Sequence, residues 1–283
     1  MAAQSFVRGV RAEKVVAGNR FITRTGTPSA PVVSVRTIHD SFGTPAMVEA
    51  RLEGGRAVRI AYGSTIRVHT NEPAPEPTLN DLPANAADGS PEAVLVAVAR
   101  EHPDDARVVT AVARLSRGLN VKSGAHLHDV AELAHLLFVE LDDRESAWCI
   151  LGLLTGLDFD GNLGRWKHVQ SALALAAFLA DQDGDAVASA HFGALLRAAD
   201  MASEDPARVR LEAEVLQRRL DNPDLFDREI RRAAAAGNTD AEHVWRNRRL
   251  RTLLFLRAHG GSRTLDADEL GRLVRFELDA LRA

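Results

Sequence analysis

The chain has 283 residues, of which 46% are hydrophobic and 26% charged, and its net charge is −4. This length favours two domains, and the composition excludes a disordered chain. A single cysteine excludes an intramolecular disulfide and a cysteine-rich zinc site. The sequence contains no apolar stretch long enough for a membrane span, and its N-terminus lacks the apolar core of a signal peptide. We therefore predict a cytoplasmic protein with no membrane partner.

The charge is divided unevenly along the chain. Residues 1–70 carry nine arginines and one lysine against four acidic residues, a net charge of +6. Since the whole chain carries −4, the remaining residues carry −10. Opposite charges of this kind permit either docking of one module on the other or separate partners for each.

The first part of the chain predicts a β domain over residues 1–70. Apolar, often β-branched, residues alternate with polar ones in six short segments, as in half-buried strands: 13–16, 19–25, 31–38, 46–53, 56–62 and 65–69. Glu53-Gly54-Gly55-Arg56 is the clearest hairpin signal, because glycine adopts positive φ without steric cost. This spacing predicts a small closed or nearly closed barrel, SH3-like or OB-like.

The segment VVAGNRFITRTGTP, followed by VVSVRTI, resembles the first strands of a Hint module, the fold of inteins and hedgehog autoprocessing domains. The chemistry of that family uses a Cys or Ser at the start of the module and a Thr-x-x-His pair. Here Thr65 and His69 have Thr-x-x-x-His spacing, and no nucleophile begins the module. The resemblance therefore implies a Hint-like fold without self-splicing.

The predicted barrel is basic, which makes nucleic acid one candidate partner. Four arginines fall on the polar phase of the predicted strands, namely Arg36, Arg51, Arg59 and Arg67. Phe21, Phe42 and Tyr62 could stack on bases. A barrel of alternating valines also needs surface arginines to stay soluble, so protein docking and a purely structural role are alternatives.

Residues 71–90 predict a linker, because they are rich in proline and acidic residues and lack apolar periodicity. The linker ends where Ser90 can act as an N-cap and Pro91 can occupy the first helical position.

From residue 91 to 283 the apolar spacing predicts an acidic all-α domain, either a bundle or a helical-hairpin array. The expected helices cover 91–101, 104–117, 124–141, 143–155, 162–182, 184–200, 206–221, 223–236, 240–258 and 265–281. The segment LAAFLADQDGDAVASAHFGALLRAAD resembles a tetratricopeptide-type unit, which implies stacked helical hairpins and a binding surface. The predicted fold class is therefore α+β with two domains.

One stretch of the helical part could bind a metal. On a helix, His128, Glu132 and His135 share a face, and Glu132-x-x-His135 has the spacing of carboxylate-bridged metal sites in bundles. His128-Asp129 also resembles the paired ligands of HD-type phosphohydrolases. The alternative is a solvated polar face opposite the apolar stripe.

Three further features have structural interpretations. The loops 158–162 and 181–185 alternate acidic residues but lack the Gly and Glu of an EF-hand, so we predict caps and turns. Cys149 lies in the apolar run AWCILGLL and predicts an inert core residue.

The stretch 245–258 predicts a basic helix with Leu250, Leu253 and Leu254 on its buried side. Its arginines Arg248, Arg249 and Arg251 would point outward and could contact phosphate. Alternatively, the arginines of this helix could pair with Glu242 and with the acidic last helix.

The sequence contains no phosphate loop, dinucleotide-binding glycine motif, nucleophile elbow or His-Glu-x-x-His motif. We therefore predict a non-enzymatic adaptor or regulatory protein, without a cofactor, whose helical array binds an unidentified protein partner. One alternative is a nucleic-acid-associated regulator that uses the barrel and helix 246–257. Another is a helical metal-dependent hydrolase centred on residues 126–135. The sequence leaves the oligomeric state open.

Overall fold

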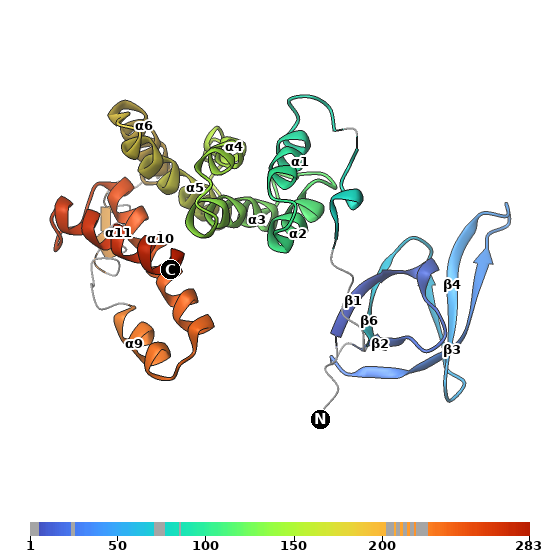
Figure 1. Cartoon of the computed structure of the whole chain (residues 1–283). Coiled ribbons are helices and arrows are strands. Elements are labelled where there is room, and N and C mark those ends of the chain that lie inside the picture. Colours follow the sequence, from blue (N-terminus) through green and yellow to red (C-terminus); the bar gives the residue numbers. More distant parts are fainter. Residues whose placement is uncertain are drawn as a thin grey trace. The chain divides into compact units, whose positions relative to one another are not determined.

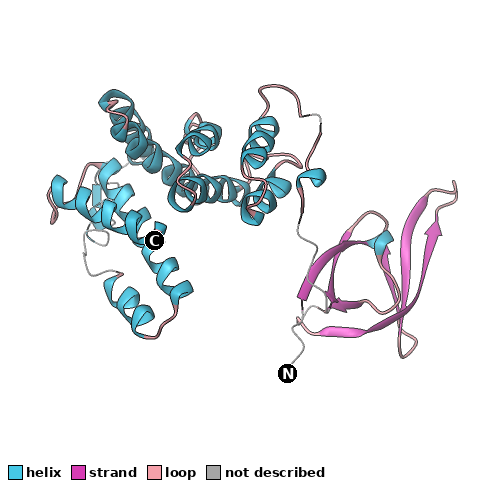
Figure 2. Cartoon of the chain, viewed as in Figure 1, coloured by secondary structure: helices cyan, strands magenta, loops and turns pink. Residues whose placement is uncertain are grey.

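The computed structural model describes residues 6–23, 26–70, 77–84, 86–201, 207, 210–211, 214–215, 218 and 226–283. The chain forms two compact units, Met1–Glu76 and Pro77–Ala283 (Figure 1). The first unit is built from strands and the second from helices (Figure 2), which confirms the predicted mixed α+β class. Much of the helix predicted at 206–221 lies outside the described residues.

The β unit is a six-stranded antiparallel sheet with the order β1-β6-β2-β3-β4-β5. Its strands are β1 (Phe6–Arg11), β2 (Arg20–Ile22), β3 (Pro28–His39), β4 (Pro45–Leu52), β5 (Ala57–Ala61) and β6 (Thr65–Thr70). The sheet is not closed into a barrel, because β1 and β5 are its two ends among the described strands. Ala12, in the turn after β1, forms a small buried cluster with Val48 and Ile60. The predicted barrel is therefore not confirmed.

The start of the β unit differs from the prediction. The expected strand at 13–16 is wrong, because residues Ala12–Lys14 form a 3-10 turn (η1). Strand β1 was not predicted, and its apolar alternation is weak: Val10 is buried, whereas Val7 is 53% exposed. The β4–β5 hairpin is confirmed, with Gly54 and Gly55 at positive φ of 90° and 85°.

All elements in the described part of the second unit are helical. Its helices are α1 (Pro91–Glu101), α2 (Ala106–Leu115), α3 (Gly124–His135), α4 (Arg144–Thr155), α5 (Leu163–Gln182), α6 (Ala186–Leu196), α7 (Ala198–Met201), α9 (Asp227–Ala235), α10 (Thr239–His259) and α11 (Ala267–Arg282), with the 3-10 turn η2 (Leu79–Asp81) before α1 and the π-helical turn η3 (Leu136–Glu140) after α3. Their boundaries follow local signals. Ser90, for example, accepts a hydrogen bond from the backbone N–H of Ala93 and so begins α1. The interpretation of these helices as a repeat array stays a prediction.

Helix α5 is the centre of this unit and packs against α3, α4, α6 and α10. It is buried on all sides from Ala172 to Ala180, as expected for a helix with an apolar surface all round. Helices α6 and α10 approach closely at Gly193, where an added Cβ would lie 2.7 Å from the carbonyl oxygen of Ala258. Glycine therefore sets the distance between these two helices.

The boundary between the units lies within the segment expected as a linker. Residues 77–90 belong to the helical unit, and Leu82 is buried in its core. Among the described residues, no helix combines the length and apolar character needed to cross a bilayer.

Candidate functional site

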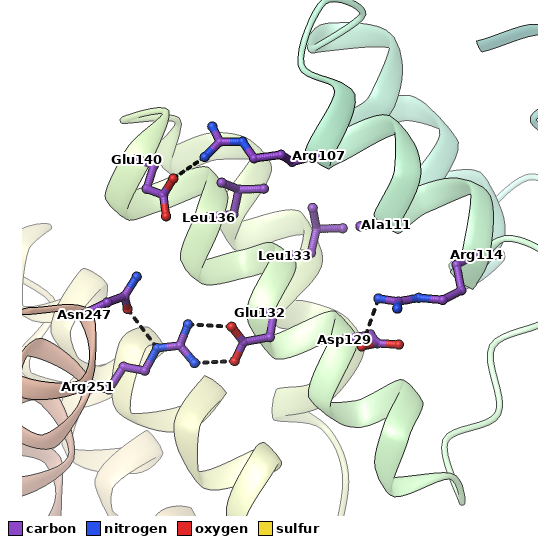
Figure 3. Close-up of a pocket in the computed structure, with 10 residues that line it drawn as sticks. All are labelled: Arg107, Ala111, Arg114, Asp129, Glu132, Leu133, Leu136, Glu140, Asn247 and Arg251. Carbon is purple, nitrogen blue, oxygen red and sulfur yellow. Dashed lines mark hydrogen bonds and ion pairs between the residues drawn. The ribbon is translucent and has the colours of Figure 1, made fainter. Parts of the chain in front are cut away.

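A cavity of about 230 Å³ lies in the helical unit between α2, α3 with its η3 extension, and α10 (Figure 3). Its floor is apolar and consists of Ala111, Leu133 and Leu136, while charged and amide groups surround this floor. The lining is completed by Arg107, Arg114, Asp129, Glu132, Glu140, Asn247 and Arg251.

Helical spacing places these side chains on the cavity. On α2, Arg107, Ala111 and Arg114 are four and three residues apart and therefore share one face. On α10, Asn247 and Arg251 are four residues apart, and their side chains are joined by a 3.0 Å hydrogen bond from Arg251 Nε to Asn247 Oδ1. The α3–η3 segment contributes both the acidic groups and the two leucines of the floor.

Three ion pairs cross between the helices around the floor. Arg107 pairs with Glu140, and Arg114 Nη2 lies 2.9 Å from Asp129 Oδ1, so both connect α2 to the α3–η3 segment. Arg251 binds both carboxylate oxygens of Glu132, with its Nη2 2.8 Å from Oε2, and so connects α10 to α3 (Figure 3). Glu140 also has His243 Nε2 at 3.2 Å from its Oε1.

The two arginines of α2 are more exposed than their acidic partners. Their side chains are 55% and 61% exposed, whereas those of Glu140 and Asp129 are 20% and 16% exposed. Arg107 also binds Asp105, which is 18% exposed, with Nη2 2.8 Å from Oδ2, so this guanidinium has two carboxylate partners that are both less exposed than it is. On the α2 side of the cavity, the two guanidinium groups are therefore more exposed to solvent than the carboxylates that they bind.

Glu132 is ionised in this setting. Its burial alone would raise the pKa, but the hydrogen bonds and the positive charge of Arg251 lower the pKa below its ordinary value. The bidentate pair thus holds a charged carboxylate in the wall of the cavity.

The structure gives the three predicted metal ligands different partners. Glu132 is bound by Arg251, and His128 Nδ1 lies 3.5 Å from Glu132 Oε1. His135 is buried, with Nε2 3.2 Å from Ser171 Oγ, so its expected place on a solvated face is wrong. Within the described ranges, no group of three His, Cys, Asp or Glu side chains is arranged to hold a metal ion. The metal-dependent hydrolase stays a prediction, without support from this geometry.

Burial has a large effect on His135. Desolvation, together with the nearby charge of Arg251, lowers its pKa to about 3, so the ring is neutral at physiological pH. The π-helical turn η3 begins at the next residue. The contacts of His135 do not explain why the helix widens there.

The basic helix α10 turns most of its arginines inward. The side chains of Arg249 and Arg251 are 14% and 27% exposed, so the expected outward orientation is wrong for both. Arg248 is exposed, as expected, and its guanidinium lies over the Trp245 ring. The intramolecular alternative is confirmed for Arg246, which pairs with Glu242 and with Glu277 of the last helix. The buried stripe Leu250, Leu253 and Leu254 is also confirmed.

In the β unit, three of the four predicted arginines lie on one face. Across β3, β4 and β5 the register aligns Arg36 with Glu49 and Glu49 with Arg59, while Arg51 lies two residues further along β4. Arg36 Nη2 is 2.7 Å and Arg59 Nε is 3.0 Å from the carboxylate of Glu49. The hydrogen bond from Arg59 and the charge of Arg36 lower the pKa of Glu49, against the effect of its burial. The fourth arginine, Arg67, lies on β6 opposite β1.

The other predicted features have clear outcomes. Asn162 and Asp185 cap α5 and α6, so the acidic loops are caps and turns as predicted. Cys149 is exposed, which corrects its prediction as a core residue. Its apolar neighbours Ala147, Ile150 and Leu151 fill the core from the other side of α4.

The α2 arginines, Glu140 and Asn247 were not predicted as site residues. The sequence shows that Arg107 and Arg114 share one face of a helix. Nothing in that spacing indicates that acidic residues of α3 and η3 would face them.

The full length of the chain, residues 1–283, matches the model of a family described as a family of unknown function (DUF6707). No curated protein and no solved structure matches the chain.

Proposed function

The chain belongs to the DUF6707 family, and we propose that it is a non-enzymatic adaptor or regulatory protein whose helical unit binds a partner protein at the α2–α3–α10 cavity. The observation that carries this proposal is the construction of the cavity, which has a small apolar floor within a rim of interhelical ion pairs (Figure 3).

The size of the cavity favours a protein segment over a cofactor. Sites for small molecules usually enclose roughly 300–1,000 Å³, whereas this cavity has about 230 Å³. Such a volume accommodates a side-chain anchor of a partner, and an apolar centre with a polar rim is the usual anatomy of a protein interface.

The exposed charges indicate the chemistry of the partner. Arg107 and Arg114 expose more of their side chains than the carboxylates that they bind, Asp105, Glu140 and Asp129. The exposed part of the rim on α2 therefore favours carboxylates from outside. The two arginines are seven residues apart on α2, which corresponds to about 10 Å along a helix. A segment with an apolar residue between two acidic ones fits this arrangement.

Photo-cross-linking in the native host tests the proposal. A benzoylphenylalanine placed at Ala111, on the floor, should cross-link to a partner protein, and the cross-linked peptide should contain acidic residues beside an apolar one. The variant Ala111→Phe should fill the floor and remove the partner from affinity purifications of the full chain.

Ala97→Phe is the matched control, since Ala97 is an exposed alanine on α1 outside the cavity. It should retain the partner. Retention of the partner by Ala111→Phe, or cross-links to small molecules alone, would contradict the proposal.

Nucleic-acid binding by helix 246–257 has less support. Arg246, Arg249 and Arg251 have carboxylate partners within the helical unit, and their side chains are only 18%, 14% and 27% exposed. For the hydrolase alternative, Glu132 is likewise occupied by Arg251. The protein-binding function therefore agrees best with the contacts of these residues.

A further inference from the structure

Strand β5 is an open end of the sheet. Among the described strands it pairs with β4 on one side, and the sheet order has no strand on the other side. An edge strand of this kind presents unpaired backbone groups and can accept a further strand.

The register shows which backbone groups are offered. The N–H of Leu52 donates to Arg56 O at 2.8 Å, and the N–H of Tyr62 donates to Ala46 O at 2.9 Å. Hydrogen-bonded and non-hydrogen-bonded pairs alternate along an antiparallel ladder. The backbone groups of Val58 and Ile60 therefore point to β4, and those of Ala57, Arg59 and Ala61 point away from it.

The carbonyl of Ala61 already accepts from the N–H of Ser64 at 3.1 Å. The groups offered outward along β5 are thus the N–H of Ala57, Arg59 and Ala61 and the C=O of Ala57 and Arg59. They form the alternating ladder that an extended peptide requires.

Side chains on the outer face determine which peptide fits. Arg36, Glu49 and Arg59 are directly opposite one another across β3, β4 and β5, so the row reads positive, negative, positive. Cross-strand neighbours of opposite charge stabilise a sheet, and like charges destabilise it. The next position in this row, opposite Arg59, therefore favours an acidic residue.

The other face of β5 is apolar, so it favours apolar residues in the bound peptide directly before and after the acidic one. Val58 is partly buried and Ile60 buried, and both belong to the small apolar clusters of the β unit. In a strand added to β5, the residues before and after the acidic one would lie beside Val58 and Ile60.

We propose that the β5 edge binds an extended segment of another protein, with an acidic residue flanked by apolar ones, as an additional strand of the sheet. This site belongs to the β unit, and the proposal does not rest on the function proposed for the helical cavity.

Charge favours this occupant over two others. A second copy of β5 in antiparallel register would place Arg59 beside Arg59, which is repulsive. A nucleic acid would meet the carboxylate of Glu49 between Arg36 and Arg59, and it has no backbone amides to pair with the edge.

A selection from a display library of random short peptides against the full chain tests the proposal. Peptides enriched on the wild type should share the apolar–acidic–apolar pattern. Replacing the acidic residue of a selected peptide by its amide should weaken binding about two- to fivefold, in line with a cross-strand pair. N-methylation of the alternate peptide nitrogens that face β5 should weaken binding at least about tenfold, because it removes backbone hydrogen bonds.

Variants of the chain locate the site. The same selection against Arg59→Glu should enrich a basic residue at the central position, whereas Arg51→Glu, an exposed position on the same face of β4, should keep the acidic preference. Since Glu at position 59 would lie opposite Glu49, Arg59→Ala serves as a second variant and should lose the preference for either charge.

Backbone hydrogen exchange gives an independent measurement. A selected peptide should slow exchange at the N–H of Ala57 and Arg59. Three outcomes would each overturn the proposal. The selection could enrich no peptide, or it could enrich peptides whose binding is unchanged by Arg59→Ala. A single-stranded oligonucleotide could also bind this edge tightly and compete with the peptides.

Discussion

The arginines of α10 and those of the β3–β4–β5 face have the same chemistry but opposite roles. Arg246 and Arg249 on α10 have side chains 18% and 14% exposed, whereas Arg36 and Arg59 on the sheet are 65% and 63% exposed. Arg249 was expected to point outward from its helix, and Arg36 and Arg59 were expected on the polar phase of their strands.

The difference comes from the carboxylates around them. Helix α10 meets acidic residues of α9, α11 and α3, namely Asp227, Glu277 and Glu132. On the sheet, Arg36 and Arg59 both pair with Glu49, which leaves an excess of positive charge. We infer that the α10 arginines stabilise the helical unit, while those of the sheet are available to an outside partner.

The largest expected effect is at the centre of the α10 network. Glu277→Ala removes the carboxylate that Arg246 and Arg249 share. The side chain of Glu277 is fully buried. Arg246 keeps Glu242 and Arg249 keeps Asp227. Deleting a fully buried side chain together with its ion pairs should still lower the free energy of unfolding, here by about 3 kcal/mol. Urea unfolding followed by circular dichroism measures this change. The exposed residue Asp279 of the same helix gives the control Asp279→Ala, expected within about 0.5 kcal/mol of the wild type.

Removal of one arginine from this network should have a smaller effect. In Arg249→Ala, Glu277 keeps Arg246 and Asp227 keeps Arg231. The deleted Arg249 side chain is 14% exposed, whereas that of Glu277 is fully buried, so less buried structure is lost. We expect the free energy of unfolding to fall by about 2 kcal/mol. A loss equal to or greater than that of Glu277→Ala would show that the network depends on Arg249 more than on the shared carboxylate.

The buried histidine next to this network predicts a pH dependence. The pKa of His135 is about 3 in the folded chain, against an ordinary value of 6.5. Between these values the unfolded chain binds a proton that the folded chain does not. The free energy of unfolding should therefore be unaffected above pH 6.5 and fall below it, by up to about 1.4 kcal/mol per pH unit. Unfolding measured from pH 7.5 to 5 checks this slope.

His135→Gln should remove this part of the slope, while His191→Gln, an exposed histidine on α6, should retain it. An unchanged slope in His135→Gln would assign the pH dependence to other groups.

The smallest expected effect is on the sheet. Arg51→Ala should change the free energy of unfolding by less than about 0.5 kcal/mol, because its side chain is exposed on β4. A loss comparable to that of Arg249→Ala in the same urea series would remove the contrast between the two sets of arginines.

The sequence by itself determined the local features of this chain. Helix α1 was predicted with its observed bounds, because Ser90 and Pro91 are a local start signal, and α5 was predicted to within one residue at its start. The β4–β5 hairpin followed from two adjacent glycines. These features depend on residues that are neighbours in the chain, so periodicity and capping suffice to find them.

The tertiary structure alone decided which polar side chains are buried and which meet. Arg251 and Glu132 are 119 positions apart, and Arg107 and Glu140 are 33 apart. No local pattern encodes such pairs, so the cavity and the inward orientation of Arg251 could not be predicted. The same holds for the burial of His135 and the open end at β5. The pairing of Arg246 with Glu242, four residues away, was local and was among the alternatives. Ion pairs and burial depend on which helices and strands pack together, and that is fixed by the core rather than by the sequence around each residue.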